Sequence, residues 1–187
     1  MTLRGTRAFA ARVDAHGRCR LTVTENEVTE RTLETILTPE RTCHNLAVSS
    51  KKKALEEVAT RMVATLPMLT TEQVFENLVA REKLGTTGIG HGVAIPHCRL
   101  PRCSGIVGGL FRLTDPIDFG ALDGEPVSIL FALLVPTREV DEHLDTLATL
   151  AARFEVPTYR EELMEADSDE ALYQAALQVP VSRAEGQ

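Results

Sequence analysis

The sequence of 187 residues contains no tryptophan, and aromatic residues make up only 4% of it. A chain of this length buries about 70% of its unfolded surface, which is enough for one domain with a substantial core. That core must consist mainly of leucine, valine, isoleucine and alanine, because these dominate the 43% of residues that are hydrophobic. No apolar run approaches the ~20 residues of a membrane-spanning helix, so we expect no membrane insertion.

Cysteine is also scarce. Cys19, Cys43, Cys98 and Cys103 form no C-x-x-C pair. The start of the chain lacks the apolar stretch of a secretory signal, since RAFAARV is short and charged. We therefore expect a cytoplasmic protein with reduced thiols. The arginine-rich start also faintly resembles an organelle transit peptide, but a poorly ordered extension is the preferred interpretation.

Charge is unevenly distributed along the chain. Residues 1–20 carry five arginines and one aspartate, a net charge of +4, whereas the whole chain has −7. The remaining acidic body lacks the clustered lysine and arginine that displace counterions from nucleic acid, so we expect no nucleic-acid partner. We interpret residues 1–30 as an extension, in which alternation over 21–28 predicts a short strand. The domain is expected over 31–179, with a tail at 180–187.

Two helical patterns come before the middle of the chain. Residues 49–66 carry an apolar stripe behind Ser50 as N-cap. The lysines that follow this cap oppose the helix dipole, which predicts a weakly held, solvated helix start. The second helix begins with a capping box formed by Thr70 and Gln73, and Gly85 is placed to end it.

The middle of the chain predicts strands. Residues 105–113 and 127–136 are apolar runs bounded by turn residues, and the second is apolar on both faces, which favours a central position. A helix is expected within 137–154, and a last helix opens on the capping pair Asp167 and Glu170. This order predicts an α/β fold: a single compact domain with a mixed central β-sheet flanked by helices.

The segment TTGIGHGVAIPHCRL, residues 86–100, places Gly88, Gly90 and Gly92 ahead of His97. Glycine gives up more backbone entropy than other residues, so such a cluster usually supplies unusual dihedrals or lets another group approach the backbone. The segment lacks the Gly-Lys-Ser/Thr of a phosphate-binding Walker loop. Its G-x-G-x-G spacing, with no helix opening after it, also differs from a dinucleotide-binding fingerprint.

The same segment contains side chains of the metal-ligand type. His91, His97, Cys98 and Cys103 lie close in sequence. Their spacing matches no zinc pattern, and no second set of paired ligands accompanies them. We therefore expect no metal and no cofactor. A histidine after a proline at a strand end is most often a satisfied polar residue, so the pattern alone assigns no role to His97.

Three segments of the sequence resemble those of a known protein family, and this resemblance suggests a function. REKLGTTGIGHGVAIPH, residues 81–97, resembles the signature of the mannitol/fructose-type enzyme IIA domains of the bacterial phosphoenolpyruvate-dependent phosphotransferase system. PIDFGALDGEPVSILFALLVP, residues 116–136, and EHLDTL, residues 142–147, resemble further family segments in the same order. The likeness covers about 31–179. The FALLVP run, in a chain without a fused permease domain, looks most like the nitrogen-regulatory branch.

The resemblance implies a phosphoryl carrier that is phosphorylated on a histidine by the histidine-containing phosphocarrier protein of the system. In the nitrogen-regulatory branch it would switch regulatory partners that the sequence does not name. One alternative is a sugar-specific enzyme IIA that passes phosphate to a separate permease subunit. Another is a binding module that keeps the fold and has lost the chemistry. Neither the oligomeric state nor the purpose of residues 1–30 follows from the sequence.

The resemblance also implies site residues. It places the phosphorylated histidine at His97, the supporting arginine at Arg81 and the second active-site histidine at His143. Thr86 stands where the family usually has serine or threonine. Two positions depart from the family pattern, since His91 stands where the nitrogen branch often has asparagine and Cys98 where glycine is common.

These residues suit phosphoryl transfer. A neutral imidazole is a nucleophile at pH 7, since its unperturbed pKa is about 6.5, and it can carry a phosphoryl group as a covalent intermediate. Arg81 offers a fixed fork for the phosphoryl oxygens. Thr86, Gly88 and Gly90 are candidates for further contacts to those oxygens, because glycine lets backbone N–H groups approach closely.

The two other histidines are expected to assist. His143 lies in the first turn of the predicted helix, where the positive end of the dipole favours the neutral ring. It would then donate one hydrogen bond without competing as the nucleophile. We expect His91 to line the rim of the site, and Cys98 to be a packing residue.

Overall fold

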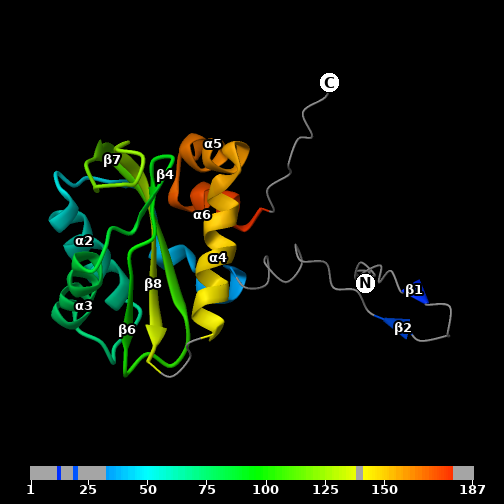
Figure 1. The fold of residues 1–187 in the computed structure, drawn as a ribbon, viewed down its shortest axis with the longest axis horizontal. Coiled ribbons are helices and arrows are strands. Elements are labelled where there is room, and N and C mark those ends of the chain that lie inside the picture. Colours follow the sequence, from blue (N-terminus) through cyan, green and yellow to red (C-terminus); the bar gives the residue numbers. More distant parts are fainter. Residues whose placement is uncertain (1–11, 14–18, 21–32, 138–140, 179–187) are drawn as a thin grey trace, which may run out of the picture.

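A six-stranded mixed β-sheet lies at the centre of the structure, with helices on both of its faces (Figure 1). The computed structural model describes residues 12–13, 19–20, 33–137 and 141–178, and the side chains of 33–137 and 144–178. The predicted mixed α/β architecture is confirmed. The strand predicted at 21–28 lies outside the described residues, and the domain limits at 30 and 179 stay predictions.

The sheet has the strand order β3-β7-β8-β5-β4, and β6 also pairs with β8. Its strands are β3 (Thr42–Leu46), β4 (Gly88–Gly90), β5 (Val93–Ala94), β6 (His97–Leu100), β7 (Val107–Ile117) and β8 (Val127–Pro136). A separate antiparallel pair consists of β1 (Arg12–Val13) and β2 (Cys19–Arg20).

The central strand is β8, as its apolar run predicted. Nine of its ten residues are buried. It pairs with β7 antiparallel on one side and with β5 and β6 parallel on the other. Along that second side β5 lies opposite Ile129 and Leu130, and β6 lies opposite the stretch that begins at Leu133. This register places His97, the first residue of β6, opposite Leu133.

Two hydrophobic clusters fill the space between the sheet and its helices. Figure 1 shows α2 and α3 on one side of the sheet and α4, α5 and α6 on the other. The helices with described bounds are η1 (Pro39–Arg41), α2 (Lys51–Val63), α3 (Thr71–Lys83), α4 (Asp141–Glu155), α5 (Pro157–Glu165) and α6 (Asp169–Leu177), and residues 33–36 are helical as well. Leucine, valine, isoleucine and alanine dominate both clusters, as the shortage of aromatic residues requires.

The predicted starts of the first two helices are confirmed. The side chain of Ser50 accepts a hydrogen bond from the backbone N–H of Lys53. Thr70 and Gln73 form the expected capping box. The second helix ends at Lys83, and Gly85 follows its C-cap. These contacts are local to each helix end, which is why the sequence predicts them well.

Several elements differ from the prediction, and the short strands β4, β5 and β6 were not predicted. The last helix is capped by Ser168, whose hydroxyl accepts from the N–H of Ala171, so the predicted pair Asp167 and Glu170 is wrong. Pro157 starts α5, a separate helix that the sequence analysis missed; a proline is well suited to a first helical position. Strand β3 was missed too. It is only five residues long and pairs with β7, far along the chain.

Candidate active site

His97 stands at the start of β6, directly after Pro96. Its Nδ1 atom lies 2.8 Å from the carbonyl oxygen of Ile95. Its Nε2 atom lies 3.0 Å from Nε of Arg81. A carbonyl oxygen only accepts hydrogen bonds and a guanidinium only donates them. In this arrangement the ring proton is therefore on Nδ1, and Nε2 presents a lone pair toward Arg81.

Arg81 reaches His97 from the last turn of α3. Its Nη1 atom donates to the carbonyl oxygen of Gly85 at 3.0 Å, so the residues that end the helix also orient the guanidinium. The structure thus brings together His97 and Arg81, two of the three predicted catalytic residues, which lie sixteen positions apart in the sequence.

The surroundings lower the pKa of the His97 ring. Burial is the largest cause, and the nearby positive charges of Arg81 and Arg99 act in the same direction. The hydrogen bond to Ile95 and the charge of Glu82 oppose the shift. The result favours the neutral imidazole, which is the nucleophilic form.

We expect the NMR titration of the His97 ring to give a pKa below 6.5, the ordinary value for histidine. Phosphoryl acceptance should therefore persist below pH 6.5 and decline only as pH falls through the lowered pKa. The unfolded chain binds this proton first as pH decreases, so the free energy of unfolding should begin to fall near pH 6.5. A ring pKa above 6.5 in the NMR titration would contradict this interpretation.

The glycine segment packs against the loop that precedes β8. A Cβ atom on Gly88 would lie 2.8 Å from the Cα atom of Ala121, and one on Gly90 would lie 3.0 Å from the carboxylate of Asp123. The N–H of Gly88 donates to the hydroxyl of Thr86, and that hydroxyl donates to the carbonyl oxygen of Phe119. Close packing within the chain is therefore one physical reason for these glycines. Contacts from this segment to a phosphoryl group stay a prediction.

The variant Gly88→Ala should lower the free energy of unfolding by about 1–3 kcal/mol, the usual cost of overpacking, because backbone atoms of the facing loop must move. The matched control is Gly105→Ala, where a new Cβ meets nothing within 4 Å. Chemical denaturation of both variants measures the difference. Equal stabilities would contradict the packing explanation.

A second polar cluster beside the site was missed by the sequence analysis. The Glu82 side chain is only 7% exposed and lies 2.5 Å from Nζ of Lys51. It also accepts hydrogen bonds from the N–H and hydroxyl of Thr87. Lys51 donates to the carbonyl oxygen of Phe119 at 2.7 Å and lies over its ring. This cluster joins α2, α3, the glycine segment and the loop before β8. The predicted solvated start of α2 fits the exposed Lys52 and Lys53, but not Lys51, which Glu82 and Phe119 hold in place.

We expect Lys51→Met to lower the free energy of unfolding by about 1–3 kcal/mol, because it leaves the buried Glu82 carboxylate without its cation. Lys53→Met is the matched control, since Lys53 pairs with Glu56 on the exposed surface of the same helix and such pairs contribute little. Urea unfolding of the two variants is the measurement. A control that loses as much stability would show that the buried carboxylate is not responsible.

The remaining predicted residues lie elsewhere or outside the described side chains. His143 belongs to the first turn of α4, but its side chain is not among those described, so its approach to His97 stays a prediction. His91 has a positive φ of 54°. Its N–H donates to Asp123, and its ring lies 3.5 Å from the carboxylate of Glu155 at the end of α4. Its predicted place at the rim of the site stays a prediction.

The cysteines in this region are buried thiols. Burial, with a smaller effect of Cys103, raises the pKa of Cys98 to about 12. Cys98 packs in the cluster beneath α2 and α3, as a packing residue should. Among the described residues, no three His, Cys, Asp or Glu side chains gather closely enough to hold a metal ion. Over the same residues, no helix is both long enough and apolar enough to cross a membrane.

Known proteins resemble this chain in both sequence and fold. Residues 35–178 match the family described as "Phosphoenolpyruvate-dependent sugar phosphotransferase system, EIIA 2". The chain is 48% identical to the nitrogen regulatory protein of Pseudomonas aeruginosa, over 79% of this chain and 96% of that protein. It is 42% identical to the nitrogen regulatory protein of Escherichia coli K12, over 81% and 93% of the two chains.

Solved structures give the same result. The crystal structure of nitrogen regulatory protein IIA-Ntr from Neisseria meningitidis has a TM-score of 0.73 and 39% identity, over 79% of this chain and 99% of that one. The IIA mannitol structure from Escherichia coli has a TM-score of 0.63 at 17% identity, over 75% and 98%, a likeness of fold alone. Given a family match over most of its length and relatives covered almost entirely, this chain belongs to the EIIA type 2 family of the phosphoenolpyruvate-dependent sugar phosphotransferase system.

Proposed function

We propose that this protein carries a phosphoryl group on Nε2 of His97 and acts in the nitrogen-regulatory branch of the phosphotransferase system. The observation that carries the proposal is the pair of contacts on the imidazole ring. The carbonyl oxygen of Ile95 holds the proton on Nδ1, and the guanidinium of Arg81 lies beside the lone pair of Nε2. The neutral imidazole of His97 is therefore the nucleophile, and the guanidinium of Arg81 lies beside its Nε2 atom, where it can bind the negatively charged phosphoryl group.

The transfer step follows from this geometry. The lone pair of Nε2 attacks phosphorus while the N–P bond on the donor breaks, and the electron pair of that bond returns to the donor nitrogen. The proton on Nδ1 does not move. The transition state is loose and spreads charge over three oxygens, so Arg81 stabilises it by turning its N–H groups from Nε2 to those oxygens.

The other predicted residues complete this proposal. His143 donates a hydrogen bond to the phosphoryl group from the first turn of α4. Thr86, Gly88 and Gly90 come from the segment that Glu82 and Lys51 hold in place, and they supply further contacts to the oxygens. His97 and Arg81 remain the two residues on which the chemistry depends.

The family supports a phosphocarrier protein as the kind of partner. EIIA domains accept phosphate from phosphocarrier proteins and pass it on, and we propose the histidine-containing phosphocarrier protein as the donor. The nitrogen branch is supported by full-length relatives at 42–48% identity whose names are nitrogen regulatory protein. The alternative, a sugar-specific component, has weaker support: a fructose-specific EIIA component of Haloferax volcanii is 32% identical over 58% of this chain.

The test is to incubate the full chain with phosphoenolpyruvate and the upstream relay, ending in the phosphocarrier protein. We expect one acid-labile, base-stable phosphoryl group per chain, detected by intact mass and by ³¹P NMR. Omission of the phosphocarrier protein is the control and should prevent labelling. No uptake with an active relay would overturn the proposed function. Rapid onward transfer to a sugar-permease subunit would favour the alternative.

A further inference from the structure

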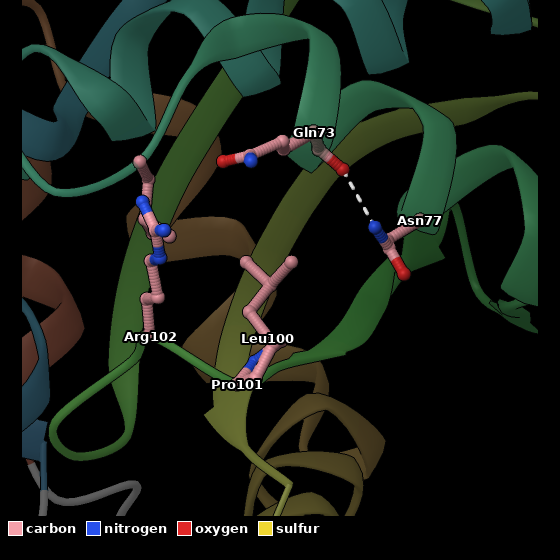
Figure 2. A pocket seen from close by; sticks show the side chains of 6 residues that line it. Gln73, Asn77, Leu100, Pro101 and Arg102 are labelled. Atoms are coloured by element: carbon pink, nitrogen blue, oxygen red, sulfur yellow. Dashed lines mark hydrogen bonds between the residues drawn. The ribbon is translucent and has the colours of Figure 1, made fainter.

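A small groove lies between α3 and the turn that follows β6 (Figure 2). It encloses about 210 Å³ and is lined by Leu69, Gln73, Asn77, Leu100, Pro101 and Arg102. The two leucines belong to the buried cluster beneath α2 and α3 and form an apolar floor. Figure 2 shows the side chain of Gln73 extending across Leu100 toward Arg102. The groove therefore combines an apolar floor with two carboxamides and a guanidinium at its rim.

The groove and the acceptor histidine are built on the same two elements. Gln73, Asn77 and Arg81 are spaced four residues apart on α3, so they follow one face of the helix. Strand β6 begins at His97 and ends at Leu100, a length of about 10 Å. A protein segment seated in the groove therefore lies beside the surface that a phosphoryl-exchanging partner must cover.

The segment that follows α3 and includes the β6 side of the groove carries only positive charge. Residues 83–114 contain no aspartate or glutamate but four lysines and arginines, in a chain with a net charge of −7. Lys83 is exposed, and so are Arg99 and Arg102, the two arginines that flank Leu100. In the described part of the chain neither of these arginines has a carboxylate within ion-pair distance. By contrast, Arg112 in the same stretch donates to three backbone carbonyl groups, so its role is internal.

The acidic residues of α3 do not neutralise this surface. Glu72 and Glu76 each precede a groove residue by one position. Successive residues on a helix are rotated by about 100°, so both glutamates lie off the face that carries Gln73 and Asn77. The guanidinium of Arg102 thus remains available to a ligand from outside.

We propose that this groove receives an acidic segment of a partner protein, with a carboxylate on Arg102 and a neighbouring apolar side chain on Leu100. A planar guanidinium fork matches a carboxylate. The Gln73 amide oxygen accepts from the N–H of Thr70, and the Asn77 amide nitrogen donates to the carbonyl oxygen of Gln73. The amide nitrogen of Gln73 and the amide oxygen of Asn77 can still bind the backbone of an extended segment. The groove is smaller than the ~300–1,000 Å³ of typical small-molecule pockets, which favours one or two side chains. The inference rests on the proposed function, since the docked protein is taken to be one that reaches His97.

The test measures binding of two fluorescent peptides to the full, unphosphorylated chain by anisotropy at low salt. One peptide alternates glutamate and leucine, and the other has glutamine in place of each glutamate. We expect the glutamate peptide to bind more tightly, and salt to weaken its binding. Arg102→Glu should reduce that affinity about tenfold, because it replaces an attraction with a repulsion. Arg61→Glu, an exposed arginine on α2, is the matched control and should leave it unchanged.

Several outcomes would overturn the proposal. They are equal binding of the two peptides, no binding at low salt, an Arg102→Glu variant that binds like the wild type, or free glutarate competing as well as the peptide. The last result would assign the groove to a small carboxylate instead. Circular dichroism checks that both variants are folded. Because the assay contains no phosphoryl donor, its failure is distinct from failure of the proposed transfer.

Discussion

We expect the variant His97→Ala to take up no phosphate from the relay, whereas wild type and His44→Ala should be labelled equally. This is the largest effect that we expect, because the covalent intermediate needs a nucleophilic nitrogen at this position and alanine has none. His44 is a suitable control, since it is a half-buried histidine on β3 that bonds to Asp169. Quantitative labelling with phosphoenolpyruvate, followed by mass spectrometry of the peptides at neutral to basic pH, measures the result.

The attachment atom provides a sharper form of the same prediction. The proton on Nδ1 is held by the carbonyl oxygen of Ile95, so the phosphoryl group should be on Nε2. Coupling between ³¹P and ¹⁵N in labelled protein distinguishes the two ring nitrogens. Phosphate on Nδ1, on His91 or on His143 would show that the assignment of the nucleophile is wrong.

The second large effect concerns Arg81. We expect Arg81→Ala to slow phosphoryl acceptance by about 10²–10³-fold, or roughly 3–4 kcal/mol in the barrier, which is typical for losing one donor to a developing negative charge. Arg81→Lys should lie between this variant and wild type, because a lysine keeps the charge but lacks the planar fork. Single-turnover transfer from the phosphorylated donor measures each rate. Lys83→Ala, two residues further along α3, is the control for a general change of surface charge.

The pH of this experiment matters. The charge of Arg81 helps to lower the pKa of His97, so its removal should raise that pKa and protonate more of the nucleophile near neutrality. Rates measured well above pH 7 separate the loss of transition-state stabilisation from this titration. A rate of Arg81→Ala that returns to the wild-type value at high pH would show that Arg81 acts only through the histidine pKa.

The same assay tests the role proposed for His143. If this residue only donates a hydrogen bond, His143→Ala should be slower than wild type by about 10²–10³-fold but still become phosphorylated. A variant as inactive as His97→Ala would make His143 essential to the chemistry. A variant as fast as wild type would remove it from the site.

The sequence by itself determined the features of the fold that depend on residues close together along the chain. The caps at Ser50 and Thr70 follow from hydrogen bonds that span three residues. The central place of β8 follows from a run that is apolar on both faces. His97 and Arg81 were identified from a contiguous motif that resembles the signature of a known family. Their suitability for phosphoryl transfer followed from the ordinary properties of imidazole and guanidinium.

Only the tertiary structure decided which distant residues meet. The glycine at position 88 predicted that some group approaches the backbone closely there. The fold shows that one such group is Ala121 of the same chain. The buried Glu82 and Lys51 lie on different helices, and no local pattern relates them. The pairing of Nε2 with Arg81 likewise depends on where the end of α3 meets the start of β6. Such contacts follow from packing two helical layers on one sheet, and packing is a property of the whole chain that spacing along it does not encode.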